Sequence, residues 1–189
     1  MINISSLYGV LGGIVASQVG SHLSTLPGTA NIPSVVRARF HKPMPDYPYV
    51  TLDITQATDY GEREFDQSIN TDNNIVYDIT KKIMVSFTVY GGYAGSANGD
   101  LAIYIANQIH ACFKFDSVRG KLKRDAGAGI TYPGIVRNEP IFLSDRHIES
   151  SNFFMLINLV DTQIDLNSGI IESIEATGNL NGHPDDSDP

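Results

Sequence analysis

Two long stretches rich in β-branched, aromatic and other apolar residues constrain the fold of this chain more than any other feature. In the first, residues 75–90, β-branched and aromatic side chains recur at every second position within each of two runs, 75–79 and 83–89, which suits one face of a β-sheet. These residues are Ile75, Tyr77, Ile79, Ile83, Val85, Phe87 and Val89. Because the stretch is longer than an average strand, we expect a turn, bend or bulge near residues 80–82.

The second stretch, residues 153–160, is apolar at both sets of alternating positions. The two sets are Phe153, Met155, Ile157 and Leu159 on one face, and Phe154, Leu156 and Val160 on the other. Two apolar faces predict a central strand that is covered on both sides. We expect the chain to turn over residues 161–168, directly after this strand.

Shorter patterns predict the remaining elements. Alternation predicts strands, and apolar residues at helical spacing predict helices. The predicted strands are 36–40, 50–54, 130–136 and 170–176, and the predicted helices are 5–23, 101–113 and 116–125. Ser96 or Asn98 is expected to cap the second helix. The long connections, each a candidate contact loop, are 41–48, 62–74 and 137–151, the last of which is expected to be partly strand.

The order of helix, strands, helix and strands predicts the fold class. It is typical of an α+β domain with a mostly antiparallel sheet and its two main helices packed on one face. A chain of 189 residues favours a single domain, which we place at residues 1–178. Residues 179–189 contain Gly, Asn and Pro and end in a cluster of aspartates, so we expect a flexible acidic tail.

Composition excludes several classes of function. The formal net charge of −8 argues against a dedicated nucleic-acid binder, because such proteins rely on Lys and Arg at phosphates. The single cysteine, Cys112, excludes an internal disulfide and a multi-cysteine metal site. No apolar run approaches the roughly 18 residues that span a bilayer. We therefore expect a protein that is soluble when made in the cytoplasm.

Three glycines in the first predicted helix have two interpretations. Gly9, Gly12 and Gly13 each cost about 1 kcal/mol relative to alanine in a free helix. They would be tolerated where another backbone packs close to that face of the helix. An ordinary core helix is the simpler interpretation, and a helix–helix contact within an oligomer is the alternative.

The search for catalytic motifs finds none that is specific. The glycine-rich segment 91–95 precedes a helix but lacks the Lys-Ser/Thr ending of a phosphate-binding loop, which favours a hinge. His110 and Cys112 point in different directions on a helix, so Cys112 is expected to be a buried, inert thiol. No catalytic residue, cofactor or metal ligand is assigned.

Two groups of charged residues are the candidate subunit or partner contacts. The only dense positive run lies on the third predicted helix and comprises Arg119, Lys121, Lys123 and Arg124. Given the net charge, a surface complementary to acidic partner subunits is favoured over a DNA-contacting patch. The second group lies in one loop and comprises Asp145, Arg146, His147 and Glu149. Salt bridges to a neighbouring subunit explain it as well as an active site does.

Four stretches together resemble the phage neck and tail-terminator family, over about residues 5–178. The stretches are SLY at 6–8 leading to DYPYVTLDI at 46–54, KIMVSFTVYG at 82–91, LSDRHIE at 143–149, and GIIESIE at 169–175. In that family a similar Pro-Tyr-(Val/Ile)-Thr-Leu stretch opens the second strand, and a long strand ends in Tyr-Gly before the second helix. The chain departs from the family in its longer excursion at 62–74 and in its acidic tail.

The resemblance implies a structural virion protein, assembled in the host cytoplasm, and no enzyme. Such proteins form a ring, typically of six subunits, on the last ring of the tail tube. The implied partners are the tube protein, the sheath if the tail is contractile, and collar or head-completion proteins. Genomic DNA would pass through the lumen without specific binding, and surplus acid facing the lumen would keep DNA from sticking.

Other functions remain open from the sequence. The first alternative is another virion structural protein, such as a head-completion, tail-tube or minor tail protein. A small hydrolase that uses Asp145, His147 or Cys112 is the second, and a DNA-binding accessory protein is the third. Stoichiometry in the particle would separate a tube protein, which is present in many copies, from a terminator.

Overall fold

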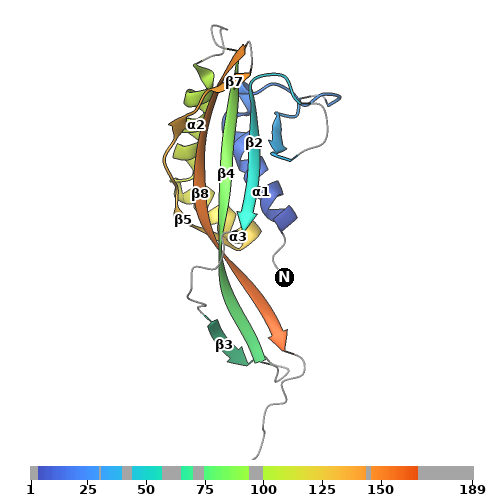
Figure 1. Ribbon diagram of the computed structural model, residues 1–189. Helices are drawn as coiled ribbons and strands as arrows, with labels where there is room; N and C mark the ends of the chain where they lie inside the picture. The colour runs from blue at the N-terminus through green and yellow to red at the C-terminus, as the bar shows by residue number, and fades with distance from the viewer. Residues whose placement is uncertain are drawn as a thin grey trace, which may run out of the picture.

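The computed structural model describes residues 4–29, 31–39, 44–56, 65–69, 75–93, 100–143 and 146–165. Its helices all pack on one face of a single sheet (Figure 1). They are α1 (Ile4–Val19), followed by a short 3-10 turn η1 (Gly20–His22), α2 (Leu101–Cys112) and α3 (Asp116–Ala126). The strands are β1 (Val35–Arg37), β2 (Tyr49–Gln56), β3 (Phe65–Ile69), β4 (Ile75–Tyr93), β5 (Ala128–Tyr132), β6 (Arg137–Asn138), β7 (Ile141–Leu143) and β8 (Arg146–Asp165).

Two long antiparallel strands, β4 and β8, form the centre of the sheet. They pair from Ile75 opposite Asp165 to Tyr93 opposite Ile148. On the β4 side lies β2, which carries β1 in parallel at its outer edge. On the β8 side lie β5, β6 and β7, each antiparallel to β8. The predicted α+β class is therefore confirmed, with a sheet that is mixed because of β1.

The core lies between the helices and the face of the sheet formed by the odd-numbered positions of 83–89 in β4 and 153–159 in β8. The buried apolar stripe of α1 is Leu7, Leu11, Ile14, Val15 and Val19, and that of α2 is Ala102, Ile105, Ala106, Ile109 and Cys112. At the centre, the rings of Phe87 and Phe153 stack in parallel, 4.7 Å apart. The helical periodicity and the alternation thus place these core side chains as predicted.

The first helix is a core helix, as the simpler interpretation holds. However, the glycines on its outer face do not meet a backbone of the described chain. A Cβ added at Gly9 or Gly13 would find no atom within 4 Å, and one at Gly12 would touch only the Val35 side chain at 3.9 Å. Whether these glycines contact another subunit stays a prediction.

An arm extends the sheet beyond the helices, and it corrects three predictions. Strand β4 runs unbroken through residues 80–82, where a turn, bend or bulge was expected, and β8 continues to Asp165, where the chain was expected to turn from residue 161. The excursion at 62–74 contains β3, paired with β4. We call β3 with residues 75–80 and 160–165 the arm; it projects past the end of the helical layer (Figure 1).

Two further predictions were wrong for physical reasons. We predicted that both faces of β8 are covered. Within the described chain only the face that carries Phe153 is covered, because all three helices pack there. On the other face, Phe154 is 37% exposed. The N-cap position of α2 is Asp100, not Ser96 or Asn98, since the helix begins at Leu101. Ser96, Asn98, the predicted strand 170–176 and the tail 179–189 lie outside the described residues.

Candidate interaction surfaces

The predicted contact residues separate into two groups at opposite ends of the body. Helix α3 lies at the end from which the arm projects, whereas β7 and the start of β8 lie at the other end (Figure 1). Of the second group, Arg146, His147 and Glu149 are placed at the beginning of β8, and Asp145 lies outside the described residues. The sequence did not indicate whether the two groups of charged residues share one surface. The structure places them on two separate surfaces.

Helix α3 turns its apolar residues inward and its cations outward. Val118 and Leu122 are buried, one helical turn apart. The exposed cations are Arg119, Lys121, Lys123 and Arg124. The helix ends at Gly127, whose positive φ of 60° allows its N–H to reach the carbonyls of Leu122 and Lys123. This arrangement leaves a solvent-facing basic surface on a helix whose C-terminus is capped.

Within α3, one of these cations is paired with a carboxylate. Lys121 Nζ lies 2.6 Å from Asp125 Oδ2, one turn along the helix. The hydrogen bond from Lys121 is the main cause that lowers the pKa of the Asp125 carboxyl, although both groups face solvent. Pairs of this kind contribute little to stability in water. The basic surface also includes the ring of Phe115, which precedes the helix and is 54% exposed.

At the other end of the body, tyrosines form a ladder that ends on Arg146. Tyr90 stacks on Tyr49 at 4.7 Å between centroids, and Tyr49 stacks on Tyr47 at 5.5 Å. Tyr47 meets the edge of Tyr93 at 5.5 Å. The guanidinium of Arg146 lies 5.3 Å from the Tyr93 ring and donates to its hydroxyl at 3.4 Å.

From Tyr49 outward, burial falls along this ladder. Tyr49 is buried, and desolvation is the main cause that raises the pKa of its phenol. Tyr93 and Arg146 are exposed at the outer end. A rigid aromatic base beneath an exposed Arg and Tyr is typical of the residues that contribute most at protein interfaces.

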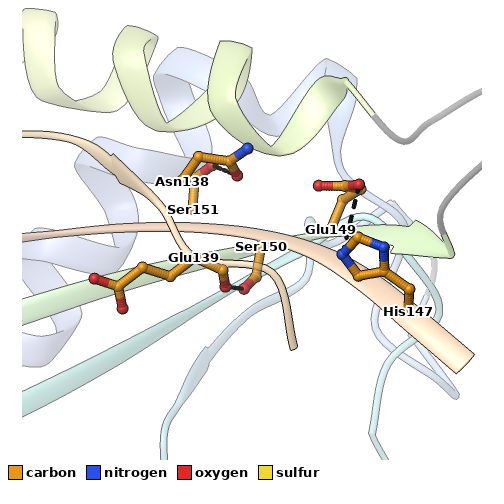
Figure 2. Close-up of polar contacts among 6 residues, drawn as sticks. All are labelled: Asn138, Glu139, His147, Glu149, Ser150 and Ser151. Carbon is orange, nitrogen blue, oxygen red and sulfur yellow. Dashed lines mark hydrogen bonds and ion pairs between the residues drawn. The ribbon is translucent and has the colours of Figure 1, made fainter. Parts of the chain in front are cut away.

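Next to the ladder, Phe142 and His147 form a stacked pair. Their rings lie 4.6 Å apart and nearly parallel, and Phe142 is 77% exposed. His147 Nε2 lies 3.8 Å from Glu149 Oε1, too far for a hydrogen bond (Figure 2). We refer to Tyr93, Phe142, Arg146 and His147 as the aromatic end of the molecule.

Hydrogen bonds hold the connection between β6 and β7 against β8. Ser150 Oγ donates to the Glu139 carbonyl, and Ser151 Oγ donates to Asn138 Oδ1 at 3.1 Å (Figure 2). Asn152 Nδ2 donates to Glu139 Oε2 at 2.8 Å. These residues position Phe142, and no sequence motif singles them out.

Of the residues named in the enzymatic alternative, the structure describes Cys112 and His147, whereas Asp145 lies outside the described residues. Cys112 is buried, donates to the Ile109 carbonyl at 3.0 Å, and has a pKa raised to about 11 by burial. His110 Nε2 instead lies 3.2 Å from the Gly134 carbonyl oxygen. Within the described ranges, no group of three or more His, Cys, Asp or Glu could hold a metal ion, and no helix is long and apolar enough to cross a membrane.

The described chain thus combines a sheet with helices on one face, two exposed surfaces of unlike chemistry and an extended arm. A sequence model of the family described as phage neck terminator protein matches residues 5–183. The chain belongs to this family, so it is a structural protein of the phage neck and tail. A comparison with curated proteins found no match.

Proposed function

We propose that the chain forms a ring, of six subunits, at the head-proximal end of the phage tail, where it ends tube assembly and joins the tail to the neck. The observation that carries this proposal is the family match over residues 5–183. The proposed partners are the tail tube protein, the sheath if the tail is contractile, and collar or head-completion proteins. Genomic DNA would cross the lumen without specific binding.

The separation of the two contact surfaces supports a joint between different partners. A subunit that ends one assembly and begins another needs two unlike surfaces, one for each neighbour. The basic face of α3 and the aromatic end lie at opposite ends of the body and differ in chemistry (Figure 1). Residues 1–178 would act as one domain, with residues 179–189 as a flexible acidic tail.

The mechanism is one of interface geometry. One surface of the ring would match the growing end of the tube, and the other would present a surface to which a further tube ring cannot add. A cyclic ring also needs two complementary side surfaces per subunit, because its interfaces are heterologous. The burial of Cys112 and the absence of a partner base beside it in the described chain favour this mechanical role over hydrolysis.

Electron microscopy of particles assembled without this gene product tests the proposal. We expect tails of irregular or excessive length beside filled heads that lack tails. Complementation with the wild-type gene should restore uniform, joined tails. Tails of normal length that are properly joined to heads would contradict the proposal, and a copy number per particle far above one ring would favour a tube protein.

A further inference from the structure

The open face of the sheet, which is the face turned away from the helices, carries a row of large apolar side chains across three strands. The register places Met84 of β4 beside Leu156 of β8, and Leu156 beside Tyr132 of β5. Phe154 lies on the same face of β8, and its ring centroid is 5.9 Å from that of Tyr132. Tyr132 is 42% exposed and Phe154 is 37% exposed. A continuous exposed apolar surface is typical of a contact with another protein.

Polar side chains surround this apolar row. Along the same face, Ser86 lies opposite Phe154, and Thr88 lies opposite Asn152. Charged side chains lie farther from the row, on β2, at the start of the apolar run of β4, and near β6; they are Asp53, Lys82, Arg137 and Glu139. An apolar centre with a polar rim is the usual composition of a protein interface.

The outer surface of the helical layer is also depleted of charge. Helices α1 and α2 contain no Asp, Glu, Lys or Arg, although 18% of the residues in the whole chain are charged. Their exposed side includes Gly9, Gly13, Ser17, Tyr104 and Asn107. The outward face of a helix at a free surface usually carries charged residues, whereas the core of an interface lacks them. We call the exposed side of these two helices the α1–α2 surface.

The α1–α2 surface is continuous and leaves room for side chains from another molecule. The ring of His22, just after α1, meets the edge of the Tyr104 ring on α2 at 5.5 Å. A Cβ added at Gly9 or Gly13 would find no atom within 4 Å, so a protruding side chain can approach the backbone of α1 there. The row on the open face supplies such side chains in Phe154 and Tyr132.

We propose that the open face of one subunit packs on the α1–α2 surface of the next copy of the chain. This inference rests on the proposed ring and names its two side surfaces. The open face and the helical layer lie on opposite sides of the sheet (Figure 1), so only a second copy can bring them together. Because two different surfaces meet at each contact, the interface is heterologous and can repeat until the ring closes.

The proposed contact accounts for the two apolar sides of β8. The helices of the same chain cover the side with Phe153, and the helices of the next copy would cover the side with Phe154. Both surfaces are nearly neutral at their centres, so neither one selects an acidic or a basic partner. A second copy satisfies both surfaces at once, which a different partner on either surface would not do.

A buried charge placed on either surface tests the contact. We expect Gly13→Arg and, separately, Phe154→Arg to weaken subunit association by about tenfold or more, because the interface would have to desolvate a guanidinium. Gly13→Arg should leave the subunit folded, since a Cβ there meets no atom and arginine favours a helix more than glycine does. Thr29→Arg, at an exposed loop position, is the matched control and should associate as the wild type does. Sedimentation of the full chain measures association, and circular dichroism checks folding.

Cross-linking in assembled tails measures the contact directly. A chain with Ser86→Cys on the open face and Ser17→Cys on α1 should give a ladder of covalent oligomers with a short bifunctional maleimide. The core separates these two positions within one chain, so the ladder reports contacts between copies. The control pairs Ser86→Cys with Thr29→Cys and should give no ladder. The native Cys112 is buried and does not compete.

The outcomes separate this contact from the ring itself. Loss of association in both arginine variants, together with a ladder from the Ser17 and Ser86 positions, supports the contact. Rings that form normally in both variants and give no ladder would overturn the contact and leave the proposed function standing. A wild-type chain present as one copy per tail would overturn the ring, and the contact with it.

Discussion

Gly134 lies so close to the backbone of Phe154 that an added Cβ would overlap the Phe154 carbonyl oxygen. Gly134 also has a φ of 71°, which side-chain-bearing residues rarely adopt. Its carbonyl oxygen meets His110 Nε2 on α2. This one residue therefore lets the segment between β5 and β6 run close against β8 while it also contacts the helical layer.

Gly134→Ala should lower the free energy of unfolding by about 2–4 kcal/mol, because both the backbone contact and the positive φ resist a side chain. Thermal and urea unfolding measure the effect. Gly129→Ala is the matched control, since a Cβ there meets no atom within 4 Å and its φ is not positive. Equal stability of the two variants would contradict the close approach.

Phe87→Ala should lower the free energy of unfolding by about 3–5 kcal/mol, because the ring packs against Phe113 and Phe153 in the buried core. Chemical denaturation of the purified chain measures this change. Phe142→Ala removes a ring of the same size from an exposed position and should change the same quantity by less than about 0.5 kcal/mol. Similar losses of unfolding free energy in the two variants would contradict the assignment of Phe87 to the core and of Phe142 to the surface.

Phe142→Ala should instead lower the yield of joined particles, because the exposed ring belongs to the aromatic end that we assign to a partner. Arg146→Lys should act in the same direction, since lysine keeps the charge but loses the planar contact with Tyr93. Electron microscopy that counts tails attached to heads is the measurement. Wild-type attachment by both variants would remove the aromatic end from the set of contact surfaces.

The stability of the chain should fall as the pH rises from about 9 toward 11, in part because of Cys112. Burial raises the pKa of its thiol from 9.0 to about 11, so the unfolded chain loses this proton first. The contribution is fully present below pH 9 and is lost as the pH approaches the folded pKa. Cys112→Ala should flatten this part of the profile of unfolding free energy against pH. If the slope of unfolding free energy against pH is unchanged in this variant, groups other than Cys112 cause the loss of stability.

The sequence predicts the local elements of this protein well because each depends on nearby residues. The stripe from Leu7 to Val15 and the alternation around Phe87 both bury the side chains that the patterns indicate. Likewise, the spacing of the apolar residues Val118 and Leu122 is enough to predict that the cations of α3 lie on its outer face. These features follow from helical and strand periodicity within short windows.

What could not be predicted depends on partners that are distant in sequence. Residues 80–82 are polar, and two of them are lysines, so they interrupt the apolar alternation and suggest a turn. Pairing with β8 nevertheless keeps β4 extended there. Apolar Phe154 suggested cover on both faces, although only packing decides which face the helices occupy. The contacts of Ser150 and Ser151 with residues 138 and 139 join segments whose polar sequence resembles an ordinary loop.

The continuity of β4 and β8 has a mechanical consequence for the joint between head and tail that we propose. The same two strands run from the arm, past the helices, to the aromatic end, paired at every step except for one irregularity between Tyr90 and Gly92. A pull along the strand axis would load the ladder of hydrogen bonds in shear, so that many must break together. Strands that are peeled apart lose their bonds one at a time and give way at a much lower force. The long axis of this subunit is thus its stiff direction, and tension between arm and aromatic end would pass through the protein without opening it.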